Sequence, residues 1–308
     1  MSFRTKLLAF FTLTIVAAVT AVAWGVTVYT RRAFEQLDRQ RTDALVAQFR
    51  REYAQRGDEI VHRVQGIADA EATLRMAMDL NRPQADASQY YNDARGIAQT
   101  QGLDFLDIVA DDGTLISSAE WPARFGYKND WVGAEQDWKS QPAFLRRVEL
   151  PDTVELGLLA VRTVSVGDKR VFLIGGQRLD QGFLATLVLP ESMRALLYRN
   201  LEPGFVPNAL TDMRGQVGQA EVFSPLITQV QRTRREQQQQ IDSISSDHGA
   251  NSENFDAIPL TGRDGNLLAV LLVGSSRLDL LQLLNFIRSL ALLVGGGVIL
   301  LGLILGWW

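Results

Sequence analysis

Two long uncharged segments stand near the ends of this chain, and a mostly polar stretch separates them. Residues 7–30 carry no charged side chain, and neither do residues 290–308. A helix needs roughly 20 apolar residues to cross a bilayer, and both segments come to about that length. The pattern therefore predicts two transmembrane helices that bracket a folded region and make the lipid bilayer one partner of this chain.

The first uncharged segment also permits a second interpretation, a cleaved secretory signal. Arg4 and Lys6 precede it, and residues 21–23 (Ala-Val-Ala) fit an A-x-A cleavage site. The apolar run continues beyond that site to Tyr29, further than the roughly 7 to 15 residues of a signal core, which favours an uncleaved anchor. Arginines lie past both ends of the segment, so charge alone does not fix its orientation.

A helical stripe of apolar residues follows the first segment. Its spacing predicts one long helix, or two with a break near Gly57, ending at Arg82-Pro83. A shorter helix is predicted over residues 87–101. The stripe can pack on its own domain or pair with a second copy in a homodimer, and both interpretations stay open. Its members are Phe34, Leu37, Leu45, Phe49, Tyr53, Ile60, Val64, Ile67, Leu74 and Met78.

From Leu103 the apolar period changes to that of strands. Residues 103–110 and 114–119 flank Asp112-Gly113, and an Asp-Gly pair between two apolar runs is a strong hairpin signal. Further strands are predicted over residues 155–166 and 169–177, separated by the Gly167-Asp168 turn. One sheet with helices at its start is the expected first module.

A similar arrangement returns nearer the second uncharged segment. Residues 255–260 and 267–273 flank a second Asp-Gly pair, which implies a second sheet module. Its first strand is predicted at Met193–Arg199. A helix is predicted within residues 220–245, with the four glutamines from Gln237 on a solvated face, then a polar loop over residues 246–253. From Leu278 a helix is expected to run into the second span.

Three segments carry a resemblance to a known family: FLDIVADDGTLISSAEWPARFGY (105–127), GGQRLDQGFLATLVLP (175–190) and FDAIPLTGRDGNLLAVLLVGSS (255–276). They resemble the double-Cache extracytoplasmic sensor regions of bacterial receptors, in particular the sensor half of membrane histidine kinases of the nitrogen-regulation type. The resemblance implies an α+β fold with two PAS-like antiparallel-sheet modules between the transmembrane helices. The first of these modules usually binds a small ligand.

The expected organisation follows from this resemblance. Residues 1–30 form the tail and first span, 31–190 the long helix and membrane-distal module, 191–277 the membrane-proximal module, and 278–308 the exit helix and second span. The expected function is the ligand-sensing input of a two-component histidine kinase in the inner membrane, with residues of about 31–284 extracytoplasmic. A chemoreceptor, a nucleotide cyclase or a membrane-anchored envelope scaffold are the alternatives.

Composition narrows the chemistry. Lys and Arg number 31 against 35 Asp and Glu, and no basic stripe with interleaved aromatic residues appears, which argues against nucleic-acid binding. The chain has no cysteine, and its histidines, His62 and His248, are interpreted as ordinary solvated or packed residues. No metal-ligand spacing, nucleophile elbow or phosphate loop is present. We expect no catalysis, no metal and no cofactor in this chain.

One aromatic stretch suggests a ligand pocket. Three of the six tryptophans fall between residues 121 and 138, together with two cationic residues. Aromatic walls with a convergent cation suit a small anionic or zwitterionic ligand, because the rings exclude water and the cation fixes the charged end. The alternative is an ordered loop that covers the sheet. The candidate ligand-binding residues are Trp121, Arg124, Tyr127, Trp131, Trp138 and Arg162.

Overall fold

The computed structural model describes residues 3–82, 85–133, 137–190, 193–245 and 249–276, together with residues 289, 290, 293, 296, 297 and 300. The chain divides into two compact units. One comprises residues 1–45, 240–255 and 274–308, and the other comprises residues 46–239 and 256–273. The second unit contains the first sheet, most of the second sheet and every cavity discussed below.

The α-helices differ widely in length. They are α1 (Phe3–Ala68), α2 (Glu71–Leu80), α3 (Asp93–Gln101), α4 (Asp130–Gly133), α5 (Gln181–Leu184) and α6 (Ser224–Thr233). Four short 3-10 turns complete the helical elements, namely η1 (Ala87–Tyr90), η2 (Pro122–Arg124), η3 (Pro207–Ala209) and η4 (Ala220–Phe223). In the described ranges no helix combines the length and apolar character needed to cross a membrane. The predicted helix from Leu278 and most of the predicted second span lie outside those ranges.

Helix α1 continues through Gly57 to Ala68 and α2 begins at Glu71, so of the two predicted alternatives the chain has two helices, with the break at residues 69–70 and not near Gly57. A Cβ added at Gly57 would lie 3.3 Å from the Cβ of Ala143, which shows that this glycine lets another segment approach the helix closely. The apolar stripe of this part of the helix is buried at Phe49, Ile60 and Val64. The prediction that the stripe packs on its own domain is confirmed for these residues.

The first sheet contains five strands in the order β2-β1-β5-β4-β3. They are β1 (Phe105–Ala110), β2 (Leu115–Ser118), β3 (Phe144–Glu149), β4 (Val154–Val166) and β5 (Lys169–Arg178), and their pairings are antiparallel. Gly113 has a φ of 81° in the β1–β2 turn, and Asp112 Oδ1 accepts the Thr114 N–H at 3.0 Å. The predicted Asp-Gly hairpin is confirmed, because this turn needs a residue with positive φ.

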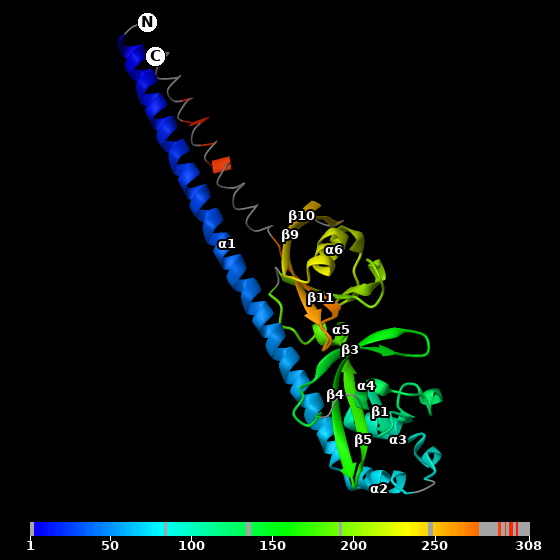
Figure 1. Cartoon of the computed structure of the whole chain (residues 1–308). Helices are drawn as coiled ribbons and strands as arrows, with labels where there is room; N and C mark the ends of the chain where they lie inside the picture. The colour runs from blue at the N-terminus through cyan, green and yellow to red at the C-terminus, as the bar shows by residue number, and fades with distance from the viewer. Residues whose placement is uncertain are drawn as a thin grey trace. The chain divides into compact units, whose positions relative to one another are not determined.

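The two faces of the first sheet are covered differently. On one face α1 packs directly on β5, since a Cβ at Gly175 would overlap the side chain of Val64, while α3 contacts β1 and α2 contacts β4 (Figure 1). The other face carries an apolar cluster that includes Phe105, Phe172 and the fully buried Trp138. Each large apolar side chain buried in this way contributes roughly 1.5 to 3 kcal/mol to stability.

The second sheet has six strands in the order β8-β7-β6-β11-β10-β9. They are β6 (Met193–Arg199), β7 (Leu210–Asp212), β8 (Gly215–Gln216), β9 (Gln237–Ser245), β10 (Gly249–Thr261) and β11 (Leu267–Ser276). Helix α6 is amphipathic and buries Leu226, Ile227 and Val230. Two antiparallel sheets with helices therefore confirm the α+β fold class.

Two predictions for the second sheet are wrong. The glutamines from Gln237 form the start of strand β9, because α6 ends at Arg234 in the left-handed region (φ 53°) and the chain continues extended. Gln238 Nε2 reaches Asp256 Oδ2 on β10 at 3.5 Å. The predicted polar loop over residues 246–253 is strand β10 from Gly249 onward. Strand β3 was not predicted from the sequence.

Candidate functional site

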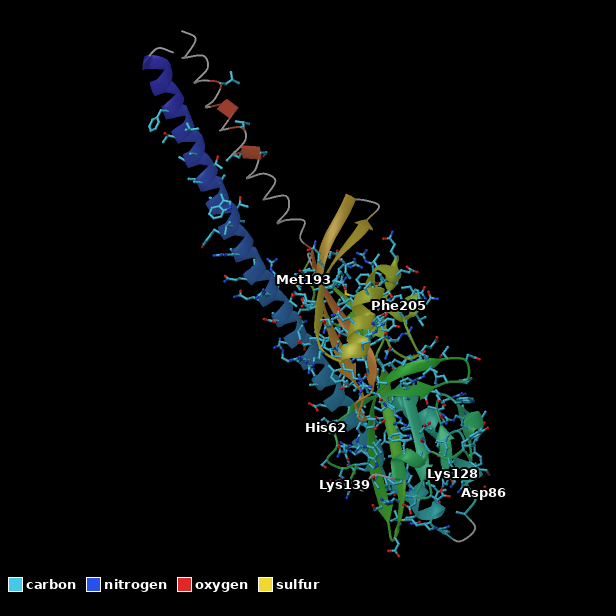
Figure 2. The ribbon with its side chains drawn as sticks, turned by 45° about the horizontal axis from the view of Figure 1, so that its top comes forward. His62, Asp86, Lys128, Lys139, Met193 and Phe205 are labelled. Atoms are coloured by element: carbon cyan, nitrogen blue, oxygen red, sulfur yellow. The ribbon has the colours of Figure 1, made fainter. Side chains whose placement is uncertain are left out.

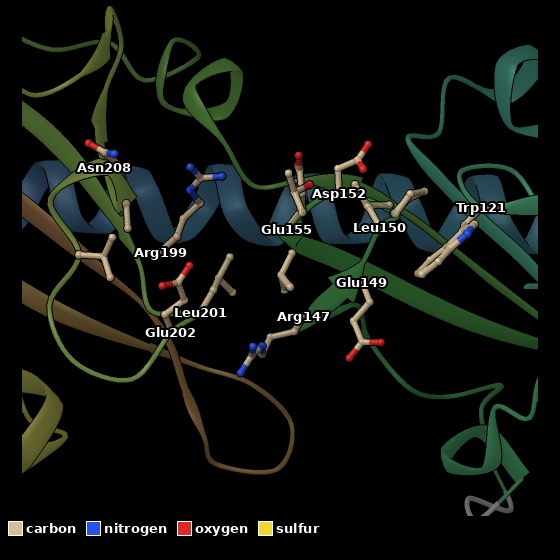
Figure 3. Close-up of a pocket in the computed structure, with 15 residues that line it drawn as sticks. Trp121, Arg147, Glu149, Leu150, Asp152, Glu155, Arg199, Leu201, Glu202 and Asn208 are labelled. Atoms are coloured by element: carbon tan, nitrogen blue, oxygen red, sulfur yellow. The ribbon is translucent and has the colours of Figure 1, made fainter.

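A cavity of about 820 Å³ lies beside the first sheet (Figure 3). One wall is the end of β3, the turn after it and the start of β4, residues 147 and 149–155. A second wall comes from the end of β6 and the segment after it, with Arg199, Leu201 and Glu202. Trp121, which follows β2, closes one end. The volume falls in the range of roughly 300 to 1,000 Å³ that is usual for small-molecule sites.

Local hydrogen bonds hold both walls in place. The β3–β4 turn is closed by a bond from the Leu150 N–H to the carbonyl of Thr153 at 2.8 Å. In the other wall the Tyr198 hydroxyl donates to the carbonyl of Gly204 and accepts the Val206 N–H, both at 3.0 Å. The ring of Phe205, labelled in Figure 2, stacks on Tyr198 with centroids 5.5 Å apart. The cavity is therefore bounded by ordered backbone on both sides.

Charged groups of both signs line the cavity. Its carboxylates are Glu149, Asp152, Glu155 and Glu202, and its guanidinium groups are Arg147 and Arg199. Glu155 is already engaged, because its Oε2 lies 3.3 Å from Nε of Arg178. The Nε of Arg199 is buried and has no hydrogen-bond partner within the described part of the chain. A buried, unsatisfied donor is costly, so a ligand acceptor at Arg199 would be stabilising.

The six sequence-predicted residues do not form one group. Trp121 lines the cavity, and Arg124 lies over its ring with Cζ 5.3 Å from the centroid. Tyr127 is 61% exposed and lies apart from the cavity lining. The other three members, Trp131, Trp138 and Arg162, form a separate group on the first sheet.

That second group is a closed set of contacts around Trp138. Trp131 meets the Trp138 ring edge-on with centroids 5.7 Å apart, and the Trp138 indole N–H donates to the carbonyl of Val132 at 2.9 Å. Arg162 Nη1 donates to the carbonyls of Trp138 and Gln141 at 2.9 and 3.2 Å. Burial lowers the pKa of Arg162. These bonds hold the loop on the sheet through Arg162 Nη1, while Arg162 Nε is buried and has no hydrogen-bond partner among the described residues.

Two acids that the sequence analysis passed over lie next to Trp121. Burial raises the pKa of Asp107 on β1, while a hydrogen bond from Ser118 and the charge of Arg124 act in the opposite direction. Burial raises the pKa of Glu120 to about 8, and the negative charge of Asp107 adds to the effect. The available signal was Asp107 itself, a carboxylate in the middle of an apolar strand.

The lining of the larger cavity, among the described residues, contains no histidine. His62 is an exposed residue of α1 (Figure 2), and His248 lies outside the described residues. Within the described ranges no cluster of three or more histidine, cysteine or acidic residues has a geometry suited to a metal ion.

Comparison with known proteins gave structural neighbours only. No family model matches the chain, and no curated protein matches it. The extracellular domain of vpHK1S-Z8, assigned provisionally as a histidine kinase, is 13% identical with a TM-score of 0.45, covering 78% of this chain and 96% of that one. The sensor domain of the V. cholerae histidine kinase DctB is 11% identical with a TM-score of 0.37, covering 81% and 97%.

A chemoreceptor is also among the neighbours. The ligand-binding domain of PctB from Pseudomonas aeruginosa PAO1, an amino acid chemoreceptor in complex with L-Arg, is 14% identical with a TM-score of 0.35, covering 71% of this chain and 85% of that one. These proteins belong to the class that the sequence resemblance named. Their TM-scores lie below 0.5, so the functional argument rests on the cavity and its residues.

Proposed function

We propose that this chain is the ligand-sensing input region of a transmembrane signalling receptor, with a two-component histidine kinase of the nitrogen-regulation type as the output. The observation that carries the proposal is the cavity of about 820 Å³, whose walls come from both sheets. A ligand bound there touches the β3–β4 turn and the segment after β6 at once. Its binding energy therefore depends on how the two walls are spaced.

This dependence supplies a mechanism. A ligand shifts a conformational equilibrium only by its differential affinity for the two states, and a site with two separate walls has such a differential whenever the walls move. We propose that each sheet with its helices is one module and that the ligand selects one spacing between them. Strand β11 leads in sequence to Leu278 and the second uncharged segment, so a change in the second sheet is passed toward the bilayer.

The ligand we propose is a small zwitterion. The unsatisfied Nε of Arg199 suits a carboxylate, and the acidic groups on both walls suit an ammonium group. Trp121 supplies an apolar wall. Arg124 lies over the Trp121 ring, and we assign it no ligand contact of its own. Trp131, Trp138 and Arg162 are assigned a supporting role, because Trp131 packs on Trp138 and the Trp138 indole N–H and Arg162 Nη1 donate to backbone carbonyls.

Screening amino acids against the full chain by thermal shift, followed by calorimetry on variants, tests this function. For any amino acid that binds, Arg199→Gln should weaken affinity about tenfold or more, since a charge-assisted contact contributes roughly 1.5 to 3 kcal/mol. Trp121→Ala removes the apolar wall and should weaken affinity to a similar extent. Arg170→Gln is the matched control, because Arg170 pairs with Asp111 away from the cavity. Unchanged affinity in both cavity variants would place the ligand elsewhere.

The membrane topology is proposed from the sequence. Residues 7–30 and 290–308 are proposed to anchor the chain in the inner membrane, with residues of about 31–284 outside and two chains forming a homodimer. Because the chain has no cysteine, Lys139→Cys gives a single thiol at an exposed residue. Intact cells should label it with a membrane-impermeant maleimide. Labelling only after lysis would contradict the topology.

A further inference from the structure

A second, smaller cavity adjoins the β3–β4 turn. Its volume is about 280 Å³, and it shares only Leu150 and Pro151 with the larger cavity. Its polar lining comes from four places: Arg95 and Gln99 on α3, Asp104 just before β1, Glu120 just after β2, and Arg178 at the end of β5. Nothing in the proposed sensing mechanism uses these residues.

The guanidinium group of Arg95 has nitrogens available to a ligand. Its Nε donates to the carbonyl of Ala119 at a long 3.4 Å, and its two terminal nitrogens donate no hydrogen bond to the described residues. Arg178 is more constrained. Its backbone N–H donates to Asp104 Oδ2 at 2.9 Å, and its buried Nε lies 3.3 Å from Glu155 without hydrogen-bond geometry.

Glu120 is the unusual member of this lining. The Leu106 N–H donates to its Oε1 at 3.0 Å, so a proton on the carboxyl group is carried by Oε2. Burial, and then the charge of Asp107, raise the pKa of Glu120 to about 8. The group is therefore a neutral proton donor at pH 7. With Glu120 neutral, the lining holds two guanidinium groups, of Arg95 and Arg178, and one further carboxyl group, that of Asp104.

We propose that this cavity is a binding site for a small organic monocarboxylate, held by the guanidinium of Arg95 and by a hydrogen bond donated from the Glu120 carboxyl group. A planar carboxylate accepts both contacts through its two oxygens, and the apolar tail lies against Leu103 and Leu150. An ammonium ligand would find no corresponding pair of acceptors. The other carboxyl group of the lining, that of Asp104, already accepts a hydrogen bond from the Arg178 backbone N–H.

The proposal has a distinctive dependence on pH. When Glu120 loses its proton it presents a negative charge to the ligand, so affinity falls above about pH 8, by up to tenfold per pH unit. The charged groups around it are Asp107 on β1, Arg178 on β5, Arg95 on α3 and Asp104 before β1. The charge of Arg178 lowers the pKa of Glu120, and it reduces the upward shift without reversing it.

The experiment titrates butyrate into the full chain in nonionic detergent and follows the ligand by saturation-transfer NMR at pH 6.5 and pH 9. Wild type should bind about tenfold more weakly at pH 9. Glu120→Gln keeps a donor without a charge, so it should bind equally at both values. Arg95→Gln should lose at least tenfold at pH 6.5, and Arg170→Gln, whose guanidinium pairs with Asp111 away from both cavities, should match wild type.

Butyramide and propylamine are the chemical controls, and neither should bind. The proposal is overturned if wild type shows no saturation transfer to butyrate at millimolar concentrations, if propylamine binds in its place, or if Arg95→Gln retains wild-type affinity. Since Arg95 is exposed on α3, its substitution leaves the fold intact, which circular dichroism checks. Unaltered pH dependence in Glu120→Gln would also overturn the role given to Glu120.

Discussion

Replacement of Glu120 by glutamine should flatten the dependence of stability on pH. In the folded chain burial raises the pKa of Glu120 to about 8, against 4.5 for an unperturbed glutamate. Between these two values the unfolded chain has lost the proton and the folded chain has kept it. Stability is therefore greatest below about pH 4.5, falls as the pH rises to about 8, and is level above that.

The size of the effect follows from the same difference. About 3.5 pKa units at roughly 1.36 kcal/mol each gives an upper bound of ~5 kcal/mol, and partial solvation of the group reduces the expected loss to about 2 to 5 kcal/mol. Asp107 contributes a slope of the same sign, because burial raises its pKa as well. Glu120→Gln should remove the part of the slope that belongs to Glu120 and leave the part that belongs to Asp107.

Urea unfolding of the full chain, followed by far-ultraviolet circular dichroism at pH 5.5, 7 and 8.5, measures this directly. Glu149→Gln is the control, because Glu149 is an exposed carboxylate at the end of β3 and its substitution should leave the wild-type slope unchanged. If Glu120→Gln loses stability between pH 5.5 and 8.5 as steeply as wild type, then Glu120 is ionised in the folded chain and the reasoning fails.

Four further substitutions test the packing around the sites, all by urea unfolding at pH 7. Trp138→Ala should destabilise the chain by about 3 to 5 kcal/mol, since this ring is fully buried in the apolar cluster of the first sheet. Arg263→Ala removes a guanidinium whose Cζ lies 4.6 Å from the Trp138 ring centroid, and the expected loss is about 1 to 2 kcal/mol. Gly176→Ala should destabilise by about 1 to 3 kcal/mol, because its Cβ would overlap the carbonyl oxygen of Leu158, whereas Gly96→Ala meets no atom within 4 Å in α3 and should stabilise slightly. Equal effects at the two glycines would contradict the packing described for β5.

The hairpins of both sheets were predictable because their turns impose a backbone requirement that few residues meet. Gly113 and Gly265 both have positive φ, at 81° and 71°. An Asp-Gly pair between two apolar runs signals this geometry from the sequence alone. The adjacent strands are buried at alternate or successive positions, so their hydrophobic pattern agrees with the turn signal.

Strands without an apolar pattern were not predictable. The first residues of β9 are glutamines, and β9 lies at an edge of its sheet, where a strand is defined by pairing with one neighbour and by no hydrophobic face. Strand β3 is the corresponding edge of the first sheet, and it carries Arg146 and Arg147 in succession. Polar composition at a sheet edge has the same appearance in sequence as a solvated helix or a loop.

The candidate site was predictable only in part, because aromatic residues in one stretch can face different places. Trp121 lies at the end of the larger cavity, but Trp138, seventeen positions later, is part of the core. The sequence gives no register for the loop between β2 and β3, so it does not decide which rings are exposed to a ligand. Asp107 was visible as a carboxylate within an apolar strand, whereas the raised pKa of Glu120 follows from its burial in the folded chain.

The turn between β10 and β11 contacts the first sheet and the loop that carries Trp138. A Cβ at Gly262 would lie 3.1 Å from the carbonyl oxygen of Leu145 on β3, so this turn of the second sheet approaches the first sheet at its edge. The next residue, Arg263, stacks on Trp138 and on Phe144. Any movement of the loop that carries Trp138 therefore changes the environment of a residue only four positions before β11. Because β11 is a central strand of its sheet and precedes the second uncharged segment in sequence, this contact connects the loop over the first sheet with the strand that precedes the proposed membrane anchor.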